Sequence, residues 1–223
     1  MKALRNLVKI IIHPRKTSHE IAQDTTIYAS LTVVFGCGLV FALLFLVSHL
    51  MHDYPPPPNE LNIWIDTWGE FAMLPFIKLP AESYRLAQAI FMLPLVLAIW
   101  LLMAGSARVL SILFGGKASF EQYLNVFGYS FFAFWILGQL LDMSYSGLLG
   151  PWVLPALRME YGLGIQIFFA NFPPVMWTMM LAIGGIYNGI VTHELEGFSL
   201  WKVVVIGTVT LAWPIVLITI LLR

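Results

Sequence analysis

The chain has 223 residues and no formal net charge at pH 7, and 59% of its residues are hydrophobic while only 11% are Asp, Glu, Lys or Arg. Soluble domains average about 25% charged residues, so this composition, with a mean hydropathy of +0.82, excludes an ordinary soluble domain and indicates an integral membrane protein. A neutral chain has no overall field that would attract nucleic acid, and a single cysteine, Cys37, excludes an internal disulfide.

Residues 1–26 precede the first long apolar stretch, and we expect them to form a cytoplasmic amphipathic segment. In MKALRNLVKIIIHPRK, apolar residues recur at helical spacing and lie largely apart from the cations: Leu4, Leu7, Val8, Ile11 and Ile12. This pattern predicts a helix that lies in the membrane interface. The basic residues of the segment are candidates for contact with anionic lipid or a partner protein: Lys2, Arg5, Lys9, Arg15 and Lys16.

The end of this segment is expected to form a second short helix. Pro14 should end the first helix, and Thr17 and Glu20 have the spacing of a capping box, which predicts that the second helix opens at Thr17. The segment lacks the clean apolar core and cleavage site of a signal peptide, so the first apolar stretch is expected to stay as a membrane helix.

Five stretches then have the roughly 20 apolar residues that a membrane helix needs. They are 27–50, 87–114, 123–149, 163–191 and 200–222. We therefore predict an all-α integral membrane protein whose five-span domain covers 27–223.

Five spans place the two termini on opposite sides of the membrane. Near the span ends, eight Lys and Arg residues fall on the N-terminal side and four on the other, with Arg108, Lys117 and Lys202 among the eight. The positive-inside rule then predicts a cytoplasmic N-terminus and a C-terminus outside.

The loop at 51–86 follows the first span. It contains four consecutive prolines, Pro55–Pro58, which favour a stiff polyproline segment. Apolar residues then recur at helical spacing, with two tryptophans suited to a membrane interface: Leu61, Trp64, Ile65, Trp68 and Phe71. This pattern predicts a short helix on the outer leaflet.

Polar residues inside the predicted spans are the candidates for a pathway or a polar core. These are Gln139, Asp142, Asn171 and Asn188. An ionisable residue such as Asp142 is costly in hydrocarbon and suggests function, although its place near the outer end also fits an interfacial cap. The asparagines fit hydrogen bonds between helices as well as solute passage, and the glycines of AIGGIYNG favour close helix packing.

Histidines provide only a weak case for a metal. His49, His52 and Asp53 have a spacing that would place three ligands on one helix face, but such residues also form a polar collar where a span leaves the bilayer. His193, Glu194 and Glu196 lie on the predicted cytoplasmic side, where we expect a solvated loop. They do not make a zinc-protease motif. We predict no metal and no cofactor.

The segment FGGKASFEQYLNVFGYS joins the second and third predicted spans. FGGKAS lacks the spacing of a phosphate loop and follows no predicted strand. We interpret it as a tight turn in which Gly115 and Gly116 end one span. Ser119 is then placed to cap the next helix.

Three segments in this order resemble a known family. The chain is similar to the Yip-domain family of Ypt/Rab-interacting integral membrane proteins in three segments: IIIHPRKTSHEIA, FGGKASFEQYLNVFGYS and GGIYNGIVTHELEGFSLWKVVVIG. The resemblance covers nearly the whole chain and implies five spans. The chain is similar to compact prokaryotic members, and the resemblance does not extend to small-GTPase binding, because eukaryotic members carry a long N-terminal extension.

The first functional hypothesis is a non-enzymatic scaffold or membrane-organising protein. Its partners would be membrane lipids, other membrane proteins or further copies of the chain, with no nucleic acid, in a prokaryotic cell membrane. The alternative is a transporter of small solutes or ions, or a lipid-translocating protein, which would use the polar residues of the third and fourth spans.

Overall fold

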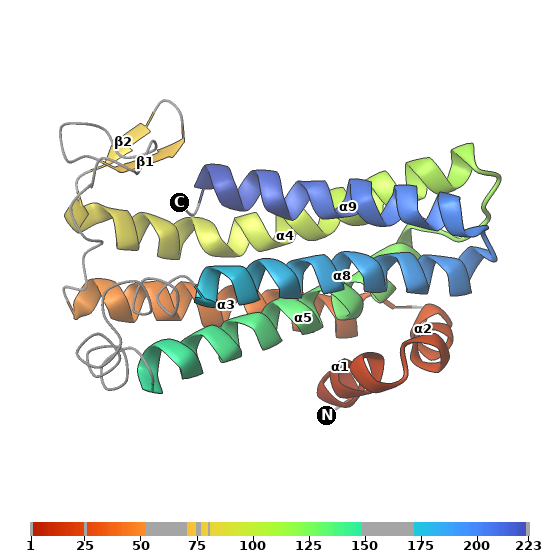
Figure 1. Ribbon diagram of the computed structural model, residues 1–223, viewed down its shortest axis with the longest axis horizontal. Helices are drawn as coiled ribbons and strands as arrows, with labels where there is room; N and C mark the ends of the chain where they lie inside the picture. The colour runs from red at the N-terminus through yellow and green to blue at the C-terminus, as the bar shows by residue number, and fades with distance from the viewer. Residues whose placement is uncertain are drawn as a thin grey trace, which may run out of the picture.

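The computed structural model describes residues 2–24, 26–51, 71–74, 77–79, 81–148 and 172–221. Its elements in chain order are α1 (Lys2–Ile12), α2 (Pro14–Ala22), α3 (Tyr28–Leu50), β1 (Phe71–Leu74), β2 (Ile77–Leu79), α4 (Ala81–Leu113), α5 (Phe120–Leu148), α8 (Phe172–Glu196) and α9 (Leu200–Leu221). The five long helices lie side by side, while α1 and α2 cover one end of the bundle (Figure 1). The predicted helical membrane bundle is therefore confirmed in its main elements.

Three helices are long and apolar enough to cross a membrane within the described part of the chain. The qualifying segments are Tyr28–Val47, Ser83–Leu113 and Leu200–Leu217. Polar residues at the start of α5, such as Gln122 and Asn125, lower the hydropathy of that helix, and side chains of α8 are described only from Met179. The count of five spans stays a prediction.

Helix α5 occupies the centre of the bundle. It packs against α3, α4 and α8, while α3 packs on α4 and α9 contacts both α4 and α8. The largest fully buried side chains are mostly aromatic residues of α5: Tyr123, Phe127, Tyr129, Phe131, Phe132 and Trp135. Trp135 stacks on Phe132 with 5.7 Å between ring centroids, so a dense aromatic core holds the helices around α5.

Close contacts at glycine explain how the last two helices approach each other. A Cβ on Gly207 of α9 would lie 3.0 Å from the Gly185 carbonyl oxygen of α8. A Cβ on Gly38 of α3 would lie 2.9 Å from the Leu93 side chain of α4. The contact at Gly185 confirms the packing role predicted for the glycines of AIGGIYNG, since small residues let helix backbones come together. Gly36, by contrast, has open space around its Cα.

Two local predictions were wrong. Helix α2 begins at Pro14, not at Thr17, because proline has its φ already set for the first helical position. Thr17 is consequently inside the helix, where its hydroxyl donates to the Lys9 carbonyl of α1 over 3.2 Å.

The second correction concerns the 51–86 loop. Phe71, expected on a surface helix, instead begins β1, which pairs antiparallel with β2. Residues 61–70, which carry the rest of that predicted helix, lie outside the described residues. Residues 71–74 and 77–79 of the loop thus form a two-stranded sheet at the opposite end of the bundle from α2 (Figure 1), and residues 81–86 already belong to α4.

Candidate functional site at the α1–α2 end of the bundle

Three connections lie at the same end of the bundle as α1 and α2. They are the link from α2 to α3, the turn between α4 and α5, and the short connection from α8 to α9 (Figure 1). Gly115 and Gly197 provide the two positive-φ positions, at +85° and +67°, that end α4 and α8. Glycine adopts this conformation without a steric penalty, so the interpretation of FGGKAS as a turn is confirmed.

Glu196, the last residue of α8, fastens this helix to the α4–α5 turn. One carboxylate oxygen accepts hydrogen bonds from the Ser111 hydroxyl, the Ala118 amide at 3.1 Å and the Tyr123 hydroxyl at 3.1 Å. The other oxygen accepts from the Lys117 amide at 2.7 Å. The carboxylate thus joins α4, the turn, α5 and α8.

The electrostatics of Glu196 follow from these donors. Partial burial would by itself raise the pKa of the carboxyl group. The hydrogen bonds from Ser111, the Lys117 and Ala118 amides and Tyr123 favour the ionised form, and together they outweigh burial, so the pKa lies below the ordinary 4.5. Glu196 is therefore an anion at neutral pH with a structural task.

The start of α5 and the neighbouring loop are held by two further sets of bonds. Ser119 and Gln122 form a reciprocal capping box, with the Gln122 amide donating to the Ser119 hydroxyl at 3.2 Å and the Ser119 amide donating to the Gln122 side chain at 2.8 Å. This confirms Ser119 as the cap. Lys202 of α9 donates to the Phe114 carbonyl at 2.9 Å and lies over the ring of Phe198, 5.1 Å from its centroid.

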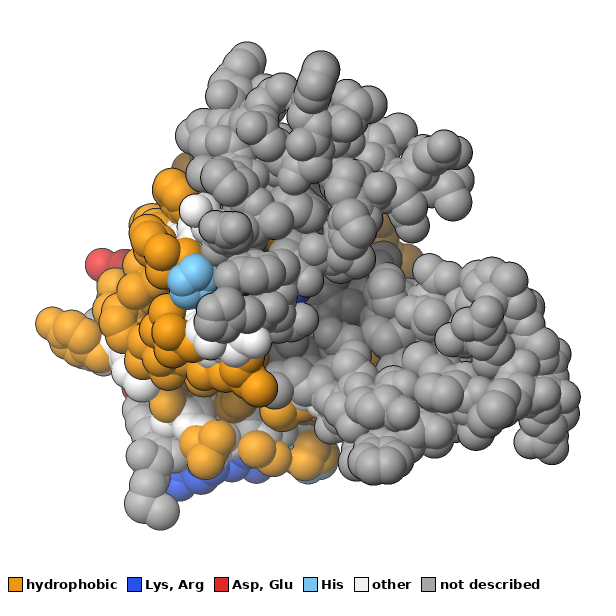
Figure 2. Space-filling view, turned by 90° about the vertical axis from the view of Figure 1, so that its left-hand side faces the viewer, with side chains coloured by type: hydrophobic (Ala, Val, Ile, Leu, Met, Phe, Trp, Pro, Cys, Tyr) orange, Lys and Arg blue, Asp and Glu red, His pale blue; other side chains and the backbone are white. Residues whose placement is uncertain are grey.

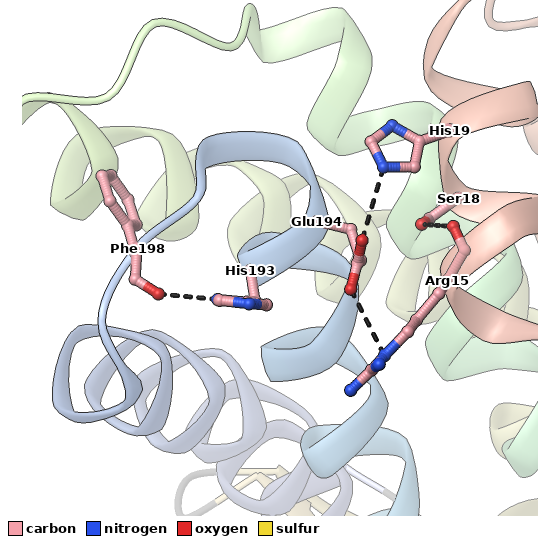
Figure 3. A network of polar contacts seen from close by, with 6 residues as sticks. All are labelled: Arg15, Ser18, His19, His193, Glu194 and Phe198. Carbon is pink, nitrogen blue, oxygen red and sulfur yellow. Dashed lines mark hydrogen bonds and ion pairs between the residues drawn. The ribbon is translucent and has the colours of Figure 1, made fainter.

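Glu194 holds α2 against the end of α8. Its two carboxylate oxygens lie 3.4 Å from Nε of Arg15 and 3.4 Å from Nε2 of His19 (Figure 3). Next to it, His193 donates from Nδ1 to the Phe198 carbonyl at 2.6 Å. Residues 193–196 are therefore the end of a helix with specific partners, and the expectation of a solvated loop was wrong.

Helix α1 is joined to the bundle by packing and by a backbone contact. Ile10 and Asn6 are buried, and the Tyr187 hydroxyl of α8 donates to the Ile11 carbonyl at 3.0 Å. Lys9 forms an ion pair with Glu20 of α2 at 3.3 Å. The two N-terminal helices thus form a docked unit.

Deeper in the bundle, a polar cluster joins α5, α8 and α9. Ser130 donates to the Asn188 side-chain oxygen at 2.7 Å, and the Asn188 amide donates to the Thr210 hydroxyl at 3.4 Å. All three residues are buried, and Thr210 also donates to the Gly207 carbonyl at 2.9 Å. Asn188 therefore serves in helix packing, one of the two roles predicted for it.

Comparison with known proteins decides the family. The family model of the Yip1 domain matches residues 8–223. The chain belongs to the Yip1 family. No curated protein and no solved structure matches it.

The Yip1 assignment agrees with the sequence resemblance. Together with the apolar helices of the bundle, it identifies the chain as an integral membrane protein. The match includes the second half of α1 from Val8, all of α2 and every long helix of the bundle. The FGGKAS turn, the Glu196 contacts and the part of the docked N-terminal unit from Val8 onward therefore lie within the matched Yip1 domain.

The basic candidates of the N-terminal segment fall on this end of the Yip1 domain. Arg5, Arg15 and Lys16 are exposed, and Lys9 is partly buried. Arg15 and Lys9 have the ion-pair partners given above, whereas Arg5 has no ion-pair or hydrogen-bond partner among the described residues. Lys2 is in α1, but its side chain is not described.

The other candidates are not brought together. Gln139 and Asp142 belong to α5, but their side chains are not among the described ones. Asn171 lies outside the described residues. His49 lies in the last turn of α3 with its Nδ1 buried, while His52 and Asp53 lie outside the described residues. Within the described chain, no three His, Cys, Asp or Glu side chains are arranged to hold a metal.

Sequence reasoning missed Glu196 and a second buried contact. Ser30 of α3 donates to the Asn125 side chain of α5 at 2.9 Å, although 95 residues separate them. Neither residue belongs to a recognisable motif. For Glu196, the available signal was the FGGKASFEQYLN segment, because a turn before a helix start leaves backbone N–H groups that can donate to a nearby carboxylate.

Proposed function

We propose that this Yip1-family chain is a non-enzymatic membrane-organising scaffold. The observation that supports this proposal is the docked unit of α1 and α2, which keeps a row of large apolar side chains turned away from the bundle. Leu4, Val8 and Ile12 are 69%, 51% and 63% exposed. An apolar row beside cations is typical of a helix lying in a membrane interface.

The same end of the bundle would face the cytoplasm. Arg108, Lys117 and Lys202, which contribute to the basic side in the positive-inside count, all lie at the ends of helices or in the turn near α1 and α2. The C-terminus would lie on the other side, in a prokaryotic cell membrane. The partners would be membrane lipids together with other membrane proteins or further copies of the chain.

Photo-crosslinking from Val8 tests the scaffold role. A photoreactive residue at Val8 in native membranes should give discrete protein adducts, whereas one at Val109 of α4, which is similarly exposed at 58%, should give diffuse lipid adducts. If the two positions give the same diffuse pattern, α1 has no protein partner.

Purified protein in liposomes tests the alternative of transport. The scaffold role predicts neither ion flux nor lipid scrambling above that of protein-free vesicles. Flux or scrambling that is lost in Asp142→Asn would overturn the proposal and assign a pathway to α5. Among the described residues, the Asn188 side chain hydrogen-bonds to Ser130 and Thr210, which supports a packing role rather than transport.

A further inference from the structure

Helix α1 presents three different sides. At about 100° per residue, the buried side chains of Asn6 and Ile10 fall on one side, which packs on the bundle. The second side carries the exposed row of large apolar residues, Leu4, Val8 and Ile12. Arg5 and Lys9 follow on the third side, next to this row and away from the bundle. Since α1 contains no acidic residue, this third side of the helix carries only positive charge.

Two cations of the N-terminal helices lack a neutralising partner among the described side chains. They are Arg5 of α1 and Lys16 of α2, and both are exposed. Lys9 and Arg15, by contrast, each lie within 3.4 Å of a carboxylate. Lys and Arg side chains line the lower edge of the molecule in Figure 2, with hydrophobic side chains directly above them, at the height where Figure 1 places α1 and α2. Each of the two helices therefore offers an unpaired positive charge to an external anion.

The two N-terminal helices meet the bundle at different depths. The Tyr187 hydroxyl of α8 donates to the Ile11 carbonyl of α1. Glu194, nearer the end of α8, contacts α2 through Arg15. Tyr187 and Glu194 are seven residues apart, which corresponds to about 10 Å along a helix. Because α8 runs alongside α9, which is apolar enough to cross a membrane, α1 lies about 10 Å closer to the membrane centre than α2.

We propose that α1 binds anionic phospholipid through Arg5, with the lipid phosphate on the cationic side of the helix and the acyl chains along the exposed row. The proposal rests on the membrane role proposed above and names the class of lipid. A bilayer presents hydrocarbon and, next to it, phosphate groups, which is the order of the exposed row and Arg5 around α1. An acidic protein surface would match Arg5 but not the three large apolar side chains beside it.

Photoreactive lipids test the preference for negative charge. The purified full chain in phosphatidylcholine liposomes receives a trace of phosphatidylglycerol that carries a photoreactive group near its glycerol backbone. A parallel sample receives phosphatidylcholine with the same group. Residues 2–12 should be labelled more strongly by phosphatidylglycerol. Equal labelling by the two lipids in the unchanged protein would overturn the proposal and leave Arg5 to an acidic protein.

Arg5→Gln and Lys16→Gln form a matched pair, because each removes one exposed and unpaired charge. Arg5→Gln should lower the ratio of phosphatidylglycerol to phosphatidylcholine labelling about fivefold, as expected for one basic residue at an anionic surface. Lys16→Gln should lower it by less than about twofold, because α2 lies about 10 Å farther out and the Debye length is about 8 Å at physiological ionic strength. Arg5→Lys should keep the ratio, and all three variants should unfold at the same temperature as the unchanged protein. Equal decreases in the two glutamine variants would overturn the assignment to Arg5, because total charge alone would then attract the lipid.

The outcome is separable from that of the scaffold proposal. The liposomes contain no second protein, so the labelling ratio does not depend on a protein partner of α1. Protein adducts at Val8 in native membranes, combined with equal labelling by the two lipids, would overturn only the lipid site. A clear preference for phosphatidylglycerol without protein adducts at Val8 would overturn only the scaffold role.

Discussion

Replacing Glu196 by glutamine tests whether one carboxylate holds the end of the bundle together. In Glu196→Gln the oxygen that accepts from Ser111, Ala118 and Tyr123 can remain a carbonyl, so three hydrogen bonds persist without the charge. The other oxygen becomes an amide group, which meets the Lys117 amide as donor against donor. One bond is lost and three are weakened.

The size of the effect follows from these four contacts. A hydrogen bond to a charged group contributes about 1.5–3 kcal/mol, and a neutral one about 0.5–1.5 kcal/mol. Glu196 is partly exposed, so water compensates a share of the loss, and we expect a decrease of about 2 kcal/mol in the free energy of unfolding. At about 2–4 °C per kcal/mol for a chain of this size, the midpoint should fall by about 4–8 °C.

The assay is thermal unfolding of the purified protein in detergent, followed by the fluorescence of its eight tryptophans. Glu194→Gln is the matched control, because the neighbouring carboxylate contacts Arg15 and His19, whose side chains are 79% and 59% exposed. Such ion pairs contribute at most about 1 kcal/mol. Equal shifts in the two variants would refute the assignment of a special structural task to Glu196.

Three further predictions use the same unfolding assay. The difference in unfolding free energy between the unchanged protein and Glu196→Gln should have its full value above pH 4.5. It should be lost as the pH falls through the folded-state pKa of this carboxyl group, which lies below 4.5. A difference that persisted in acid would show that the charge of Glu196 does not cause it. Asn188→Ala should cost about 1 kcal/mol, because the buried Ser130 hydroxyl loses its acceptor and Thr210 loses one of its two hydrogen bonds. Thr32→Val, whose hydroxyl bonds within its own helix, should cost less; equal costs would argue against the cluster. Gly128→Ala should destabilise by about 1–3 kcal/mol, because its Cβ would lie 2.8 Å from a side chain of α3, and Gly36→Ala should not; a neutral Gly128→Ala would show that α3 and α5 can separate without cost.

Much of the fold could be predicted because a membrane simplifies the signal. Long apolar runs locate α3, α4 and α9 directly, and the order of motifs identified the family. Local structure could also be predicted where the residues that form it are close in sequence, as in the Ser119–Gln122 cap and the turn at Gly115. The start of α2 was misjudged because Thr17 and Glu20 satisfy a capping pattern that Pro14 overrides.

The candidate site was less predictable because its contacts are long-range. Glu196 and the Lys117 amide are 79 residues apart, and no spacing rule relates them. The prediction for the outer loop was wrong at Phe71 for another reason. The apolar spacing over 61–71 fits a helix, but Phe71 pairs in a strand. Periodicity describes a segment in isolation, whereas pairing and docking depend on which segments meet.

The buried hydrogen bonds between helices constrain the order in which the bundle assembles during synthesis. Ser30 is already synthesised when Asn125 emerges, so that pair can form at once. Ser130, however, must wait for Asn188, which is translated 58 residues later, or roughly 3–12 s at 5–20 residues per second. Until then its hydroxyl depends on its own backbone, on water or on the insertion machinery. The last hairpin to enter the membrane, α8 with α9, therefore completes a core that α5 cannot satisfy alone.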